Sequence, residues 1–203
     1  MTTISIIGAG NMAQAIGTVA AKGGASVEFV ARDASAALAA VPGSTAVTYG
    51  EPFSGDIVVL AVPYPAVASI LDAYDFTGTT VIDITNPLDF STFDSLVVPA
   101  GSSAAAEIAA AVPGASVLKA FNTTFAGTLH AGTVGENTTT VLIAGDDADA
   151  KAALAAVVTA GGLTAIDAGA LSRAHELEAI GFLQLTLAAS EKIGWTGGFA
   201  TVA

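Results

Sequence analysis

The chain has 203 residues, of which 53% are hydrophobic, and its six Lys and Arg residues against 18 Asp and Glu give a formal charge of −12. So acidic a surface repels nucleic acids and anionic membranes, and the absence of cysteine excludes disulfides, Cys-ligated metals and Cys nucleophiles. The sequence has no uninterrupted apolar run of about 18 residues and no recognisable signal peptide. We therefore expect a cytoplasmic protein that binds neither nucleic acid nor membrane.

The first predicted elements are a strand and a helix joined by a glycine-rich turn. Residues 4–17 run from an apolar strand through Gly8, Gly10 and Ala13 into a helix predicted over residues 9–22. Gly8 permits a tight turn, Gly10 lets a pyrophosphate approach the backbone, and Ala13 lets the helix pack closely on the strand. The unpaired N–H groups of the first helical turn favour phosphate. This context predicts a dinucleotide-binding turn; the alternative is an ordinary glycine turn in another α/β protein.

The second predicted strand, residues 27–30, ends at Ala31, Arg32 and Asp33. In a dinucleotide site the end of this strand meets the adenosine ribose. An acidic residue there binds the 2′-hydroxyl of NAD, whereas an Arg accommodates the 2′-phosphate of NADP. We therefore interpret Arg32 as favouring NADP(H). Alternatively, Arg32 is a surface charge and Asp33 is the N-cap of the helix predicted over residues 34–40.

Strands and helices continue to alternate along the chain. The predicted strands are residues 46–48, 56–62, 80–84, 116–120, 138–143 and 163–166, and the predicted helices are residues 66–73, 103–111, 150–160 and 172–193. This order predicts an α/β protein with a Rossmann-type, doubly wound, mostly parallel sheet, a C-terminal β/α extension and a long terminal helix. We expect one NADP-binding domain over residues 1–203. Residues 1–112 would form its dinucleotide-binding core, and residues 113–203 a sheet extension with the acceptor side and a dimer face.

Ligands of such sheets lie beyond the carboxyl ends of the strands, so the segments that follow the strands are candidate parts of one crevice. Asn86 and Pro87 are alternatively a rigid turn, and the polar residues 122–124 are alternatively turn formers. The candidate cofactor-binding residues are Gly8, Ala9, Gly10, Asn11, Met12, Ala13, Ala31, Arg32, Ala61, Val62, Pro63, Tyr64, Asn86 and Pro87.

The chain resembles the NADPH-dependent oxidoreductases of the deazaflavin coenzyme F420 family and the related NADPH-binding domain of the six-transmembrane STEAP ferric reductases. The matching segments are Ile7-Gly-Ala-Gly-Asn-Met12, Ala31-Arg32, Ala61-Val-Pro63, Ser103-Ala-Ala-Ala-Glu-Ile108, Val117-Leu-Lys-Ala-Phe-Asn-Thr123 and Ile166-Asp-Ala-Gly-Ala-Leu-Ser172. The resemblance implies NADPH on the glycine turn, with Arg32 on its 2′-phosphate and its nicotinamide near residues 62–64 and 86–87. It also implies that a flavin or deazaflavin ring stacks on the nicotinamide. The implied substrate residues are Ala120, Asn122, Thr123, Thr124 and Phe125.

Two departures from the family pattern bear on the second substrate. Residues 34–38 lack the further basic residue that assists on the 2′-phosphate in the deazaflavin enzymes, and residues 122–125 are closer to the ferric reductases. The acceptor therefore stays open among coenzyme F420, FAD, FMN and others. The sequence has no membrane domain, so we do not expect haem-linked ferric reduction within this chain.

Ring-to-ring hydride transfer depends on alignment more than on acid–base catalysis, and the sequence offers no evident catalytic set. His175 is an outside candidate near the start of the last helix, and His130 is more typical of a surface residue. No metal-binding spacing or nucleophile elbow occurs. We expect an NADP-dependent oxidoreductase that transfers a hydride between NADP(H) and a flavin or deazaflavin, acting as a homodimer that completes a half-open crevice. The alternatives are an NADPH-dependent reductase of a small imine or carbonyl, and a non-catalytic NADP-binding sensor.

Overall fold

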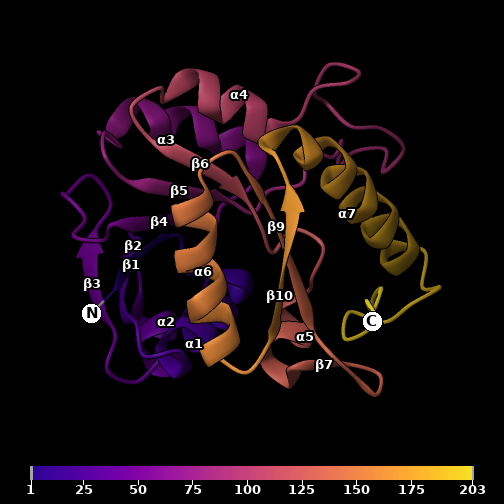
Figure 1. The fold of residues 1–203 in the computed structure, drawn as a ribbon, viewed down its shortest axis with the longest axis horizontal. Helices are drawn as coiled ribbons and strands as arrows, with labels where there is room; N and C mark the ends of the chain where they lie inside the picture. Colours follow the sequence, from indigo (N-terminus) through magenta and orange to yellow (C-terminus); the bar gives the residue numbers. More distant parts are fainter. Residues whose placement is uncertain (1, 203) are drawn as a thin grey trace.

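The computed structural model describes residues 2–202 and contains an eight-stranded sheet in the order β10-β9-β6-β5-β4-β1-β2-β3, with helices packed around it (Figure 1). The strands of this sheet are β1 (Thr3–Ile7), β2 (Ser26–Ala31), β3 (Thr45–Thr48), β4 (Ile57–Leu60), β5 (Thr80–Asp83), β6 (Ser116–Lys119), β9 (Thr140–Gly145) and β10 (Thr164–Gly169). Neighbouring strands are parallel except β6 and β9. The predicted α/β fold with a mostly parallel sheet is confirmed.

The helices are α1 (Asn11–Lys22), α2 (Ser35–Ala40), α3 (Val67–Ala73), α4 (Ala104–Ala111), α5 (Ala126–Ala131), α6 (Ala148–Ala160) and α7 (Ala174–Ala189). Short 3₁₀ helices η1 (Tyr64–Ala66) and η2 (Leu171–Arg173) precede α3 and α7. Among the described residues, no helix is long and apolar enough to cross a membrane.

The sheet separates two apolar layers, because successive side chains of a strand point to opposite faces. In β1, Ile4 and Ile6 pack with residues of α1, α5 and α6, whereas Ile7 packs with residues of α3 and α4. Buried on both faces, the central strands are continuous apolar runs, which is the pattern expected of parallel strands in an α/β protein. Because helices cover both faces of the sheet, the carboxyl ends of the strands are where a ligand is expected.

The strand order places a topological switch point at β1. From β1 the chain moves outward to β2 and β3, then returns to β4 on the other side of β1. Ligands of open α/β sheets bind where the order reverses in this way. The glycine turn that follows β1 lies at this point.

Several predicted boundaries were wrong by a few residues. Helix α1 begins at Asn11, two residues later than predicted, because Gly10 is its extended N-cap. The N-cap of α2 is Ala34 rather than Asp33, whose carboxylate instead accepts a hydrogen bond from the Ser35 N–H at 2.9 Å. Helix α7 is shorter than the predicted range 172–193: η2 precedes it, and Glu191 adopts a left-handed backbone with φ 58° just beyond its end.

A small hairpin was absent from the predicted strands. A two-stranded hairpin, β7 (Thr133–Val134) and β8 (Asn137–Thr138), lies between α5 and β9. Gly135 in its turn has φ 59°, a left-handed conformation that suits glycine. The hairpin is too short to leave an alternating apolar pattern in the sequence, so periodicity could not indicate it.

Candidate functional site

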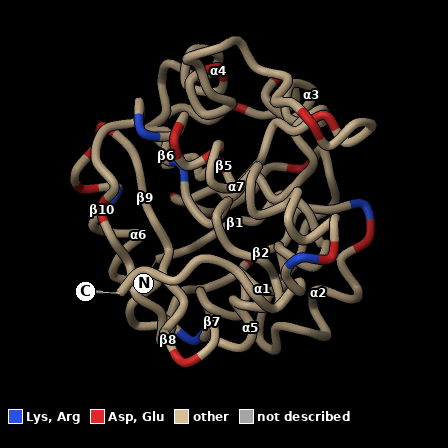
Figure 2. Tube along the Cα trace, turned by 90° about the vertical axis from the view of Figure 1, so that its right-hand side faces the viewer, with Lys and Arg blue, Asp and Glu red and all other residues tan. Residues whose placement is uncertain are grey.

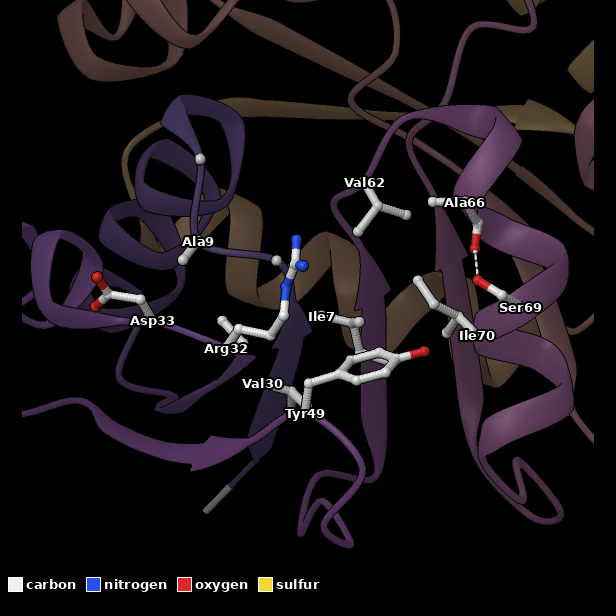
Figure 3. Close-up of a pocket in the computed structure, with 13 residues that line it drawn as sticks. Ile7, Ala9, Val30, Arg32, Asp33, Tyr49, Val62, Ala66, Ser69 and Ile70 are labelled. Atoms are coloured by element: carbon white, nitrogen blue, oxygen red, sulfur yellow. Dashed lines mark hydrogen bonds between the residues drawn. The ribbon is translucent and has the colours of Figure 1, made fainter.

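A cavity of about 820 Å³ opens at the switch point, between the glycine turn, the ends of β2 and β3, and the segment from η1 into α3 (Figure 3). Six predicted cofactor-binding residues line it, namely Gly8, Ala9, Gly10, Ala31, Arg32 and Val62. The structure thus brings together the glycine turn and the basic residue after β2, although these lie on two successive strand–helix units of the sequence.

The backbone of the glycine turn is held close to the neighbouring strands. Gly8 has φ +123°, and a Cβ there would overlap the carbonyl oxygen of Ala61. At Gly10 a Cβ would meet no atom within 4 Å, so the space above this residue is open. No side chain caps the N-terminus of α1, whose 12 residues include no acid in the first turn. Its free N–H groups and dipole therefore make this turn suitable for an anion such as a pyrophosphate.

Arg32 has no carboxylate partner among residues 2–202. Its side chain is exposed and extends into the cavity (Figure 3). Within residues 2–202 it takes part in no ion pair. The adjacent Asp33 forms no ion pair with Arg32, and its carboxylate accepts hydrogen bonds from Ser35, which lower its pKa. Arg32 is therefore available to an anionic group, such as the 2′-phosphate of NADP.

Other predicted cofactor-binding residues lie beside the cavity rather than along it. Ala13 is fully buried between α1 and the sheet, and Met12 packs against the same core. The Tyr64 hydroxyl donates a hydrogen bond to the Glu107 carboxylate, which links η1 to α4. Burial, together with Glu107, raises the pKa of Tyr64 above its usual value of 10.0. Asn11 and Pro63 are exposed.

Asn86 and Asn122 bind each other and α7. The Asn86 Nδ2 donates to the Asn122 carbonyl at 2.9 Å, and Asn122 Nδ2 donates to Asn86 Oδ1 at 2.9 Å and to the Leu177 carbonyl at 2.8 Å. Gly181 allows this approach, because a Cβ there would overlap Asn86 Oδ1. These amides fix the exits of β5 and β6 to α7, and their contact with a cofactor or acceptor stays a prediction.

The segment predicted to contact the acceptor is largely buried. Ala120, Asn122, Thr124 and Phe125 are buried, whereas Thr123 is half-buried. The Phe125 ring packs against Trp195 with the ring centroids 5.0 Å apart. Two oxygens of this region, Asn122 Oδ1 and Thr85 Oγ1, are buried without a hydrogen-bond partner among the described residues. The segment, which the structure describes in full, does not line the cavity at the glycine turn.

The two histidines also lie outside that cavity. His175 Nδ1 is 3.0 Å from the carbonyl oxygen of Ser102, ahead of α4, and His130 is exposed in the last turn of α5. In the described part of the chain, no group of three or more His, Cys, Asp or Glu residues could hold a metal ion.

Sequence reasoning missed a buried charge cluster formed by Lys119, Asp83 and Glu178, whose side chains are all 0% exposed. Lys119 Nζ donates to Asp83 Oδ2 at 2.7 Å, to Glu178 Oε1 at 2.7 Å and to the Thr85 carbonyl at 2.6 Å. Glu178 Oε2 also accepts from the Ala104 N–H at 3.0 Å, at the start of α4. Burial raises the pKa of Glu178.

The sequence does contain a signal for this cluster. Lys119 follows Val117 and Leu118 and precedes Ala120 in a strand that is apolar on both faces. A lysine in such a strand needs buried carboxylates, because an unpaired charge is very costly away from water. The pattern does not indicate which carboxylates they are.

Comparison with known proteins gives one family model, described as NADP oxidoreductase, coenzyme F420-dependent, which matches residues 3–87. The chain is 30% identical over 182 residues to the metalloreductase STEAP3 of Rattus norvegicus, covering 87% of this chain and 36% of the relative. The chain therefore spans about a third of the length of that curated relative.

Solved structures that are similar along most of the chain include the following two. A hypothetical protein of Sinorhizobium meliloti is 30% identical, with a TM-score of 0.74, over 85% of this chain and 87% of that one. A protein of Arthrobacter sp. FB24, provisionally described as an F420-dependent NADP-reductase, has a TM-score of 0.87 at 23% identity and covers 100% of both chains. The latter likeness establishes the shared fold.

Proposed function

We propose, from the premise that this chain belongs to the family of coenzyme F420-dependent NADP oxidoreductases, that it transfers a hydride between NADP(H) and a flavin or a deazaflavin of the coenzyme F420 type. The observation that carries the proposal is the cavity in which an open, uncapped glycine turn and the unpaired Arg32 face the same space. A dinucleotide with a 2′-phosphate matches both features.

The residues present suit NADP(H). Gly8 and Gly10 would admit the pyrophosphate at the N-terminus of α1, and Arg32 would hold the 2′-phosphate. When bound, NADPH supplies the hydride. The chain would then hold the nicotinamide and the acceptor ring in alignment, since hydride transfer between two rings needs proximity rather than a proton donor. The hydrogen bonds from Asn86 to Asn122 and from Asn122 to α7 give the strand exits a fixed geometry.

The test is anaerobic oxidation of NADPH by the purified chain with coenzyme F420, FAD, FMN or a small cyclic imine, and with NADH in parallel. We expect turnover with at least one flavin or deazaflavin and a preference for NADPH over NADH. Turnover of the imine alone would instead identify an imine reductase. Tight NADPH binding without any turnover would identify a sensor.

We also propose that two copies pair through α7. This helix turns Glu178 and Gln184 inward, at 0% and 1% exposure, and leaves Leu183 outward at 51%. Glu176, which pairs with Arg173 at 3.1 Å on the exposed surface, lies in its first turn, and Lys192 lies just beyond its end. Antiparallel packing about a two-fold axis would therefore set opposite charges of the two copies together while covering Leu183.

A further inference from the structure

The buried charge cluster of Lys119, Asp83 and Glu178 lies at the level of the cavity and two strands away from it. Strand pairing aligns the last residues of four neighbouring strands in one row, which runs Ile7, Leu60, Asp83 and Lys119. Ile7 lines the cavity. Neighbouring strands are about 4.8 Å apart, so the backbone of Asp83 is about 10 Å from that of Ile7. The cluster therefore lies beneath the crevice, at the exits of β5 and β6.

The cluster holds one negative charge in excess. Lys119 Nζ donates three hydrogen bonds, which uses all three protons of an ammonium group. Among the described residues, Asp83 and Glu178 only accept hydrogen bonds, from Lys119 and from backbone N–H groups. That arrangement suits two ionised carboxylates. Two carboxylates against one ammonium leave a single negative charge among side chains that are 0% exposed.

The groups around the cluster do not cancel this excess. The positive N-terminal end of α4 faces Glu178, whose oxygens accept from the N–H groups of Ala104 and Ala105 at 3.0 and 3.4 Å. Glu107, in the first turn of α4, offsets that dipole with a negative charge. In the part of the chain that the structure describes, no ion pair brings a second cation to the cluster.

The field of the cluster extends to the segment η1, which borders the cavity. Tyr64 lies between Val62 and Ala66 in the sequence, and both of these residues line the cavity. The pKa of Tyr64 is raised first by burial, then by Glu107, and further by the two carboxylates of the cluster. A negative charge raises the pKa of a phenol because it disfavours the phenolate. The same charge would favour a cation placed beside Tyr64.

We propose that the excess negative charge of this cluster shifts the relative affinity of the chain toward oxidised NADP⁺ and away from NADPH. The two forms differ at the nicotinamide ring, which carries a positive charge in NADP⁺ and none in NADPH. The proposal rests on the proposed function, because it takes that ring to lie near the exits of β4 and β5. Asp83 and Glu178 then set the preference between the two redox states without touching the dinucleotide.

Such a preference bears on the direction of the reaction. When NADPH gives a hydride to the acceptor, two electrons and a proton leave the ring together and the ring becomes a cation. A fixed negative charge lowers the free energy of that cation, so it makes bound NADPH a stronger hydride donor. Buried carboxylates exert this effect better than surface carboxylates, because water and salt screen them less.

The experiment is displacement of NADPH by NADP⁺ from the full chain without an acceptor, followed by the fluorescence of NADPH. The midpoint gives the ratio of the Kd for NADP⁺ to the Kd for NADPH, and bound nucleotide stabilises each variant throughout. For Glu178→Gln and for Asp83→Asn we expect this ratio to rise about three- to tenfold, as for unit charges about 10 Å apart in a medium between protein and water. The two substitutions lie on α7 and β5, and each leaves Lys119 with one carboxylate partner.

Matched variants separate charge from shape. Glu178→Asp keeps the charge but shortens the side chain, so any loss of affinity should be equal for the two nucleotides and the ratio should stay unchanged. Glu136→Gln makes the same chemical change as Glu178→Gln at an exposed position between β7 and β8, and it should also leave the ratio unchanged.

The outcomes distinguish this proposal from the proposed function. An unchanged or lower ratio in a folded Glu178→Gln or Asp83→Asn variant, or an equal rise in Glu178→Asp, would overturn the effect of the buried charge and leave the proposed function standing. A folded wild type that binds neither nucleotide would overturn the proposed function itself.

Discussion

Arg32 and Lys119 are both cations at the carboxyl end of a strand in the same sheet, yet their surroundings are opposite. Arg32, after β2, is exposed and takes part in no ion pair within residues 2–202. Lys119, at the end of β6, is fully buried and donates to two carboxylates and a carbonyl. Figure 2 shows how sparse Lys and Arg are along the trace of this acidic chain.

The difference separates the half of the crevice that we propose binds the cofactor from a half organised by internal contacts. Near Arg32 the polar groups are left open, as they must be if an outside anion is to satisfy them. Near Lys119 the charged groups pair with one another and join β5, β6, α4 and α7, although Thr85 Oγ1 has no partner among the described residues. In this chain, the strand-end cation without a carboxylate partner is a candidate for binding an anionic ligand. The strand-end cation held by two carboxylates instead links elements of the fold.

The largest expected effect follows from removing the buried cation. Lys119→Met leaves Asp83 and Glu178 buried without their partner, so the free energy of unfolding should fall by about 3–5 kcal/mol. Urea denaturation measures the loss. The control is Arg173→Met, which breaks the pair with Glu176, in which the two side chains are 54% and 51% exposed; it should cost about 1 kcal/mol or less. Equal losses in the two variants would contradict the contrast between buried and surface cations.

Replacing Arg32, the strand-end cation that forms no ion pair within residues 2–202, should affect cofactor binding rather than stability. Arg32→Ala removes a charged hydrogen-bond donor of about 1.5–3 kcal/mol, so we expect the Kd for NADPH to rise by about 10- to 100-fold with little change for NADH. Fluorescence titration with both nucleotides measures it. Arg173→Ala is the control, because Arg173 is exposed and lies outside the cavity. Tighter binding of NADH than NADPH by the wild type would refute the role of Arg32.

Titration of Glu178 gives a smaller, pH-dependent effect. Because burial raises its pKa above the usual 4.5 in the folded state, the folded chain binds more protons than the unfolded chain just above that pH. The free energy of unfolding of the wild type should therefore fall relative to Glu178→Gln as the pH rises from 4.5 through the raised pKa. The decline is about 1.4 kcal/mol for each pH unit that separates the folded pKa from the unfolded one. Denaturation curves across this range check the sign, and a relative gain with rising pH would show that Lys119 lowers the pKa instead.

The smallest effect on the folded chain is expected on the outer face of α7. Leu183→Glu places a charge on an exposed position, so stability should change by about 0.5 kcal/mol or less. The same change should convert the proposed dimer into a monomer, as measured by light scattering after size-exclusion chromatography. Glu176→Lys should weaken the dimer and adding Lys192→Glu should restore it. A monomeric wild type would rule out pairing through α7.

The parts of the site that could be predicted depend on residues close together in sequence. The local order of strand, turn and helix is enough to predict the roles of Gly8, Gly10 and Arg32. The structure brings these three residues to one cavity. The charge cluster could not be predicted in the same way, because Asp83, Lys119 and Glu178 meet only after β5, β6 and α7 have packed. The pattern of its helix also gave no sign that Glu178 is buried. Helix α7 buries polar residues and exposes Leu183, against the usual preference for apolar residues inside.

The contact between Trp195 and Phe125 gives this chain a built-in optical probe. Trp195 is the single tryptophan in the sequence, and its ring packs 5.0 Å from a residue of the segment predicted to meet the acceptor. This tryptophan lies outside the cavity at the glycine turn. If the acceptor binds at that segment, selectively excited emission of Trp195 should change on binding, so its uptake could be followed without any label.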